Sequence, residues 1–276
     1  MDFELTDKQK LVRRKVRTFS EEVLEPVAPI IDKEASFSWE TAKELSKINA
    51  WGIQLPEKFG GAALDSISYV ITIEEISKVC ASTGLALTVH NSVGAWPIYN
   101  WGTEEQKERL LPDIASGEKI AGFTWTEPNA GSDAGAIECM AVEDGDDLVL
   151  NGSKIFVTNG AVGDVFLVGT RYKLDSGEKG LATLIVESDM DGYEIGPKED
   201  KLGMRGNPTS SLYFHDVRVP KKNVLGSLND GFRIAMKTLN VGRIGIAAQA
   251  LGLAQAAYEY SVKYFKERIQ FYKPIS

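Results

Sequence analysis

Apolar residues recur at helical intervals through the first 120 positions of the chain. A capping-box sequence, TDKQ at 6–9, precedes one apolar face that ends at a proline: Val12, Val16, Phe19, Val23 and Pro26. A second helix is expected at 38–50, and a second capping box, TEEQ at 103–106, opens another. The segment 66–94 is apolar on most sides, which predicts a buried helix. We therefore predict an all-α domain over residues 1–119.

The period changes to that of strands from about residue 120. Short β-branched and aromatic runs alternate with turns: IAGFTWT, DLVLNG, SKIFVTNG, DVFLVGTRY, LATLIVES and SLYFHDVRVP. Asn151-Gly152 and Asn159-Gly160 predict hairpin turns. Residues 120–226 are thus expected to form an antiparallel β domain.

The helical period returns after Gly231. One apolar stripe lies along this helix: Ile244, Ala247, Ala248, Leu251, Ala254, Tyr258, Val262 and Phe265. A lone helix cannot bury its own apolar face, so 227–276 is interpreted as the first helix of a C-terminal helical bundle, incomplete as it stands. The fold class is α+β, with the two kinds of element in separate domains.

Composition narrows the class of protein. The 276 residues carry a net charge of −8, which argues against a nucleic-acid partner because phosphate binding needs dense Lys and Arg. We find no run of about 18 apolar residues and expect no membrane span. The N-terminus resembles no secretion or transit signal, so a cytoplasmic location is predicted. Cys80 and Cys139, in unrelated contexts, predict neither a disulfide nor a metal site.

Titratable residues give few candidates for catalysis. His90 and His215 lie in different predicted domains with no nucleophile placed to form a triad, so structural or surface roles are expected. Glu74 and Glu75 are adjacent on a helix and point about 100° apart. We expect one to be solvated and the other to be paired, rather than an acid-base couple.

The β region is more informative. FTWTEPNAGSDAG at 123–135 and FVTNG at 156–160 each end a predicted strand with a threonine beside an aromatic residue. Two such strand ends could present hydroxyls and backbone N–H groups to a flat heteroaromatic ring, and GSD at 131–133 could bind a phosphate. Each could equally be an ordinary turn. The glycines do not follow the G-x-G-x-x-G spacing of dinucleotide folds.

At these residues the sequence resembles the acyl-CoA dehydrogenase family, especially its bacterial short-chain, butyryl-CoA-type members. FTWTEPNAGSDAG and NGSKIFVTNG match the two flavin signatures, GTEEQKERLLPDIASGEK matches the N-terminal domain, and TLNVGRIGIAAQALGLAQAAYEY with KYFKERIQFYKPIS matches the start of the C-terminal domain. The resemblance implies an FAD enzyme, a homotetramer, that desaturates an acyl-CoA thioester between Cα and Cβ. Hydride would go to flavin N5 and electrons to an electron-transferring flavoprotein.

Residue roles follow from the resemblance by position. It implies FAD contacts for Phe123, Thr124, Trp125, Thr126, Ser132, Phe156, Val157, Thr158, Arg268 and Gln270. Arg268 and Gln270 would act across a subunit interface. Ser132, Asn240 and Arg243 are implied to contact the substrate's CoA portion. We expect Leu87, His90 and Val93, on the buried 66–94 helix, to line the acyl pocket.

The sequence also departs from the family. Asn240 stands where relatives have Asp, Tyr272 where they have Gly, Ile269 replaces a common Lys, and Trp125 is unusually bulky. The family's catalytic glutamate, in an I-Y-E-G-T motif, does not occur here, and the alternative position is Gly242. We expect no catalytic residue within these 276 residues, which we interpret as the front part of a longer enzyme, inactive alone. The alternatives are a non-catalytic flavin- or acyl-CoA-binding module and a flavin oxidase.

Overall fold

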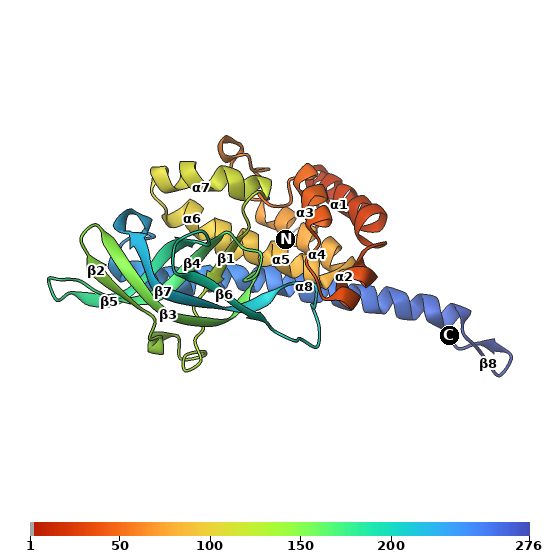
Figure 1. The fold of residues 1–276 in the computed structure, drawn as a ribbon. Helices are drawn as coiled ribbons and strands as arrows, with labels where there is room; N and C mark the ends of the chain where they lie inside the picture. Colours follow the sequence, from red (N-terminus) through yellow and green to blue (C-terminus); the bar gives the residue numbers. More distant parts are fainter. Residues whose placement is uncertain (1–2) are drawn as a thin grey trace.

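The computed structural model describes residues 3–276, with a layer of helices beside a twisted sheet and one long helix running along both (Figure 1). The α-helices are α1 (Asp7–Phe19), α2 (Ala28–Glu34), α3 (Trp39–Lys47), α4 (Ser66–Val79), α5 (Ala81–Val89), α6 (Trp96–Trp101), α7 (Glu104–Ser116) and α8 (Gly231–Glu267). Both predicted capping boxes are present. The Thr6 and Thr103 hydroxyls accept from the backbone N–H groups three residues on, and the glutamine side chains there accept in return.

The predicted single helix over 66–94 is wrong in one respect. The backbone of Cys80 is extended (φ −141°, ψ 100°), so α4 ends at Val79 and α5 begins at Ala81, followed by a π-helical turn at His90–Ala95. A Cβ on Gly84 would lie 2.0 Å from the Ser77 hydroxyl, which shows how tightly α5 folds back on α4. A segment that is apolar on all sides has no periodic signal to mark such a break.

The sheet forms the second layer. Its strands are β1 (Ala121–Thr124), β2 (Met140–Asp144), β3 (Asp147–Thr158), β4 (Val165–Lys173), β5 (Lys179–Glu187), β6 (Tyr193–Lys198) and β7 (Thr209–Pro220). They follow the order β1-β4-β2-β3-β7-β6, with β5 on the other edge of β4. β4 runs parallel to β1 and to β2, and both of these strands pair with the same edge of β4. All other strand pairs in this sheet are antiparallel. The order of helices, sheet and helix confirms the α+β class.

Neither predicted hairpin turn joins two paired strands. Asn151 and Gly152 lie inside β3, where a bulge against β7 takes up the positive φ of Gly152 (138°). A Cβ there would lie 2.8 Å from the Cys139 sulfur, so the glycine serves close approach. Asn159 and Gly160 do form a turn after β3, but the next strand, β4, does not pair with β3.

The long helix α8 leaves most of the predicted apolar stripe open, as expected of a bundle helix without its partner helices. Of the predicted stripe, Ala248 is buried while Ile244, Leu251, Tyr258 and Phe265 are exposed. The buried positions include Gly245, Gln249 and Gly252, and a Cβ on Gly252 would lie 2.4 Å from the Glu74 carbonyl oxygen. Small residues thus let α8 approach α4 closely. Beyond this contact the helix runs out past the other helices, ending in the hairpin of β8 (Ile269–Gln270) and β9 (Lys273–Pro274) (Figure 1).

Candidate functional site

The first candidate segment, Phe123–Thr126, leaves the sheet at the end of β1. The rings of Phe123 and Trp125 stack with their centroids 6.1 Å apart and an interplanar angle of 10°. The indole N–H of Trp125 donates to the Ala134 carbonyl at 2.7 Å, and Phe232 of α8 meets the indole edge-on at 6.5 Å. This segment is therefore fixed on both sides by packing and by one hydrogen bond.

The second candidate segment, Phe156–Thr158, ends β3 after another bulge against β7. Phe156 has a positive φ (56°) and its side chain is 62% exposed, while Val157 is buried. Positive φ is uncommon for a bulky residue and marks local backbone strain. Immediately afterwards, the Asn159 amide donates to the Ala86 carbonyl of α5 at 3.2 Å, which ties this segment to the helical layer.

The fold brings these two segments together. The backbone N–H of Ile155 donates to the Thr126 carbonyl at 3.0 Å. Within residues 3–276, the buried Thr124 hydroxyl has no hydrogen-bond partner. It is one of eleven such buried side-chain atoms among these residues, so it supports a ligand here only together with the rings beside it. Two stacked rings, an exposed phenyl ring and an unpaired hydroxyl on adjoining strand ends fit a flat heteroaromatic ligand with polar edges.

A buried ion pair that the sequence analysis missed joins the same segments. The Lys154 ammonium, fully buried, donates to the Glu127 carboxylate at 2.6 Å and to the Trp125 carbonyl at 3.2 Å. Burial lowers the pKa of Lys154, and the neighbouring carboxylate offsets part of that effect. Glu127 also accepts from the backbone N–H groups of Glu138 at 2.5 Å and Cys139 at 3.0 Å. A lysine at an inward strand position was the available signal, since buried lysines are almost always paired.

The GSD sequence lies in an exposed loop beyond the first segment. Glu127 and Ala130 exchange two backbone hydrogen bonds, which closes the E-P-N-A turn before it. Ser132 and Asp133 are exposed, and a Cβ on Gly131 would meet nothing within 4 Å. The loop has room for a ligand group.

The two predicted CoA contacts on α8 lie beside each other. The Arg243 guanidinium donates to the Asn240 side-chain oxygen, and both residues are exposed. They follow Phe232, which contacts Trp125, by about 12–17 Å along the helix axis at 1.5 Å per residue. Between them, a Cβ on Gly242 would lie 2.9 Å from a Val93 methyl group, so this position has no room for an acidic side chain without a shift.

Arg268 and Gln270 lie elsewhere in the molecule. They belong to the end of α8 and the short hairpin that projects from it, far from the strand ends (Figure 1). Both side chains are exposed. The turn residues Phe271 and Tyr272 have φ values of 50° and 64°, so Tyr272 occupies a conformation that favours glycine. Within one chain these two predicted cofactor contacts do not join the others.

The residues predicted to line an acyl pocket are buried in the core. Leu87 and His90 have no exposed surface and Val93 is 8% exposed. His90 accepts from the Ala121 N–H through Nδ1 at 3.1 Å and donates through Nε2 to the Ile114 carbonyl at 3.0 Å. Burial lowers the pKa of His90 to about 4, so the ring is neutral. His90 therefore has a structural role, joining α7 to β1, and the pocket prediction for it and Leu87 is wrong.

The remaining titratable candidates also have structural or surface roles. Glu75 is buried and paired with Arg17 at 2.8 Å. Glu74 is 19% exposed and lies 3.9 Å from Arg13, so both carboxylates have an ion-pair partner and neither is fully solvated. His215 is exposed and lies 3.6 Å from Glu194. Within the described part of the chain, neither cysteine forms a disulfide and no cluster of three or more His, Cys, Asp or Glu suits a metal ion.

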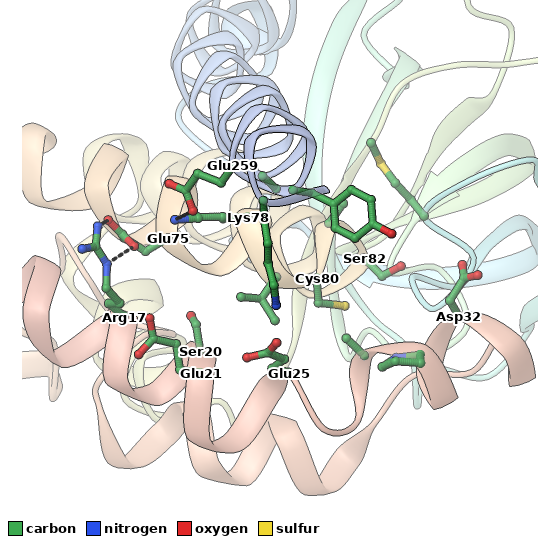
Figure 2. A pocket seen from close by; sticks show the side chains of 18 residues that line it. Arg17, Ser20, Glu21, Glu25, Asp32, Glu75, Lys78, Cys80, Ser82 and Glu259 are labelled. Carbon is green, nitrogen blue, oxygen red and sulfur yellow. Dashed lines mark hydrogen bonds and ion pairs between the residues drawn. The ribbon is translucent and has the colours of Figure 1, made fainter. Parts of the chain in front are cut away.

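Glu75 belongs to the wall of a groove of about 740 Å³ between α4, α8 and the segment from the end of α1 to α2 (Figure 2). Arg17, Lys78 and Glu259 project into it from these helices. A second groove of about 770 Å³ runs along α1. Neither groove is lined by any residue of the two candidate segments at strand ends, Phe123–Thr126 and Phe156–Thr158, called the strand-end segments below.

Among residues 3–276, no helix combines the length and apolar character needed to cross a membrane.

Known proteins with similar sequences cover almost the whole chain. The short-chain specific acyl-CoA dehydrogenase of Clostridium acetobutylicum is 47% identical over 271 residues, which are 98% of this chain and 72% of that protein. A chain in the solved structure "Electron transferring flavoprotein of Acidaminococcus fermentans: Towards a mechanism of flavin-based electron bifurcation" is 43% identical with a TM-score of 0.96, covering 100% of this chain and 73% of that one. The structure of an acyl-CoA dehydrogenase complexed with FAD from Bacillus anthracis is 33% identical with a TM-score of 0.91, covering 99% and 46%.

Family models divide the chain into three matches. The acyl-CoA dehydrogenase N-terminal domain matches residues 6–118, the middle domain 122–217 and the C-terminal domain 229–276. The strand-end segments fall at the start and in the interior of the middle match. By sequence and by fold, the chain belongs to the acyl-CoA dehydrogenase family.

Proposed function

We propose that this chain binds FAD between the Phe123–Thr126 and Phe156–Thr158 segments and serves the α,β-desaturation of a short-chain acyl-CoA. The observation that carries this proposal is the junction of the two segments by the Ile155–Thr126 hydrogen bond, next to the unpaired Thr124 hydroxyl. Membership of the family and the FAD named for the Bacillus anthracis relative support it. Bound FAD supplies the hydride acceptor, and an electron-transferring flavoprotein receives the electrons.

The chain's own groups would orient and shield the reacting atoms. The aromatic rings of Phe123, Trp125 and Phe156 would exclude water from the two faces of the cofactor. Backbone groups and the hydroxyls of Thr124, Thr126 and Thr158 would hold its polar edge, with Ser132 toward its phosphates. Arg243 and Asn240 would bind the CoA portion, because a guanidinium fork both stacks and binds phosphate oxygens. Arg268 and Gln270 would reach the cofactor of another subunit in a tetramer.

A second candidate function is a module that binds FAD and acyl-CoA without turnover. Two observations favour it: Gly242 carries no acid, and Glu127, the carboxylate next to the first segment, is buried and paired with Lys154. The Glu127 carboxylate accepts from an ammonium and two backbone N–H groups and is 6% exposed, so it is not placed to reach a substrate proton.

One experiment separates these functions. The purified chain is titrated with FAD, followed by flavin fluorescence, and then mixed with butyryl-CoA without oxygen while the visible flavin absorbance is recorded. Because no catalytic base is expected within residues 1–276, the same measurement is made on the full-length gene product. Bleaching of that protein is expected for a dehydrogenase, and rapid peroxide formation on admitting air would instead mark an oxidase. A shifted but unbleached spectrum of the full-length protein would mark the binding module. Failure to bind FAD would overturn both candidates.

A further inference from the structure

The two candidate segments do not share a regular strand ladder. β2 pairs with β3 only as far as Met140 and Asn151. Beyond that point β3 continues alongside the chain at 123–127, where the backbone of Ile155 makes one bond to Thr126. The strand-end segments therefore need another connection to hold their spacing.

The Lys154 side chain supplies that connection. Its ammonium donates to the Trp125 carbonyl, taking the place of a backbone donor, and to the Glu127 carboxylate. Glu127 in turn accepts from the N–H groups of Glu138 and Cys139 at the start of β2. One buried pair thus links the first segment, the start of β2 and β3 immediately before the bulge that presents Phe156.

We propose that Glu127 and Lys154 are positioning residues, whose buried ion pair sets the spacing of the Phe123–Thr126 and Phe156–Thr158 segments for the cofactor. The inference rests on the proposed function. Neither residue needs to touch the cofactor: Lys154 has no exposed surface and Glu127 is 6% exposed. They act through the backbone at Trp125 and Ile155. A binding site holds its ligand well only if such supporting contacts lock the residues that touch it.

The test compares Lys154→Met and Glu127→Gln with a matched pair elsewhere. Arg17→Met and Glu75→Gln break another ion pair with a buried carboxylate, between α1 and α4, away from the strand ends. Each variant is examined for thermal stability, for FAD affinity and for the circular dichroism of the bound flavin. Hydrogen exchange at the amides of Glu138, Cys139 and Ile155 gives a measure that does not depend on the cofactor.

We expect all four variants to be less stable, and only the Lys154 and Glu127 variants to bind FAD more weakly. Partners that orient the ligands of metal sites contribute about 10–100-fold to affinity, and a loss of that order is expected here. Their flavin dichroism should change and the three amides should exchange faster. Lys154→Arg should restore part of the affinity, because it keeps a charged donor.

Lys154→Met leaves an unpaired buried carboxylate and could unfold the protein. The double variant Glu127→Gln with Lys154→Met removes both charges and should fold while still binding FAD weakly. If either folded variant binds FAD with unchanged affinity and dichroism, the positioning role is wrong although the proposed function stands. If the unaltered chain binds no FAD, the proposed function itself fails, and the positioning role with it.

Discussion

Residues assigned to the cofactor occur in two regions that differ in how they are held. At the strand ends, Trp125 and Val157 are buried, and Lys154 and Asn159 tie the backbone to neighbouring strands and helices. At the far end of α8, Arg268 and Gln270 are exposed on a short hairpin that contacts little else. The first region is organised by the chain itself, whereas the second offers exposed side chains that a neighbouring molecule could use. Changes in the first region should therefore alter global stability, and changes in the second should act locally.

The largest effect is expected from protonation of His90, which joins α7 to β1 just before the first segment. Its pKa falls from 6.5 to about 4 in the folded chain because burial disfavours the charged ring. The unfolded chain binds a proton first as pH falls, so stability present above pH 6.5 is lost toward pH 4, by about 3 kcal/mol. Urea unfolding at several pH values across this range measures how steeply the free energy of unfolding falls as the pH falls. His90→Asn should flatten this dependence relative to His215→Gln, which changes an exposed ring, and equal slopes in both variants would contradict the assignment.

The docked part of α8 provides the next test. A side chain at 252 would collide with the Glu74 carbonyl of α4, so Gly252→Val should lower the free energy of unfolding by about 1–3 kcal/mol. Ala254→Val, on an exposed position of the same helix, should change it by less than about 0.5 kcal/mol. Chemical denaturation of both variants decides the point. Equal losses would mean that the two faces of α8 are packed alike.

Packing at the first segment can be tested through one hydrogen bond. Trp125→Phe removes the indole N–H that donates to the Ala134 carbonyl and part of a buried ring that packs on Gly169, so the cost should be at least the roughly 1 kcal/mol of one hydrogen bond. The exposed Trp39 serves as a control, because Trp39→Phe removes an indole outside the core. The denaturant midpoints of the two variants are compared, provided that the dependence of the free energy of unfolding on denaturant concentration is the same in both. A loss as large in the Trp39 variant would show that the Ala134 contact is not what holds the loop.

Periodicity and capping signals were sufficient for the order of domains and for the starts of α1 and α7. They failed where the structure is decided by the close approach of one backbone segment to another, which leaves no periodic pattern in the sequence. The break at Cys80 brings Gly84 of α5 against Ser77 of α4, and the bulge at Gly152 brings the backbone against the sulfur of Cys139. The open apolar stripe of α8 was predicted, but the face that packs on α4 contains Gly245 and Gly252, which the hydrophobic pattern did not show. A pattern of hydrophobicity cannot report which face a partner approaches most closely.

In the candidate site, too, some features could be predicted from the sequence and others depend on contacts that only the folded chain makes. Its two threonine-ended strands were visible in the sequence, and the family resemblance supplied roles that stay predictions. The Lys154–Glu127 pair was missed. The strand position of Lys154 was a signal, but only the folded sheet shows that its ammonium keeps no exposed surface and needs a partner. The pocket predictions for Leu87 and His90 were wrong for a related reason: on a segment without polar positions, the sequence pattern does not distinguish side chains that face a cavity from side chains in the core.

The smallest effect is expected at the hairpin that carries Arg268 and Gln270. Tyr272 has a φ of 64° and is fully exposed, so its ring makes little contact that would offset the backbone strain. Tyr272→Gly relieves a left-handed conformation that costs an L-residue about 1–2 kcal/mol, against about 0.5–1 kcal/mol of added chain entropy. The net local gain should be below about 1 kcal/mol. It is measurable as slower hydrogen exchange of the Ile275 amide, which donates to the Arg268 carbonyl at 3.0 Å.

The global free energy of unfolding should not change in Tyr272→Gly, since the hairpin lies outside the packed core. Lys273→Ala, next to the turn, is a suitable control because it leaves both positive-φ residues unaltered. Faster exchange at Ile275 in the glycine variant would mean that the tyrosine ring stabilises the turn. In that case the second region would also be organised by the chain itself, and its contrast with the strand ends would be lost.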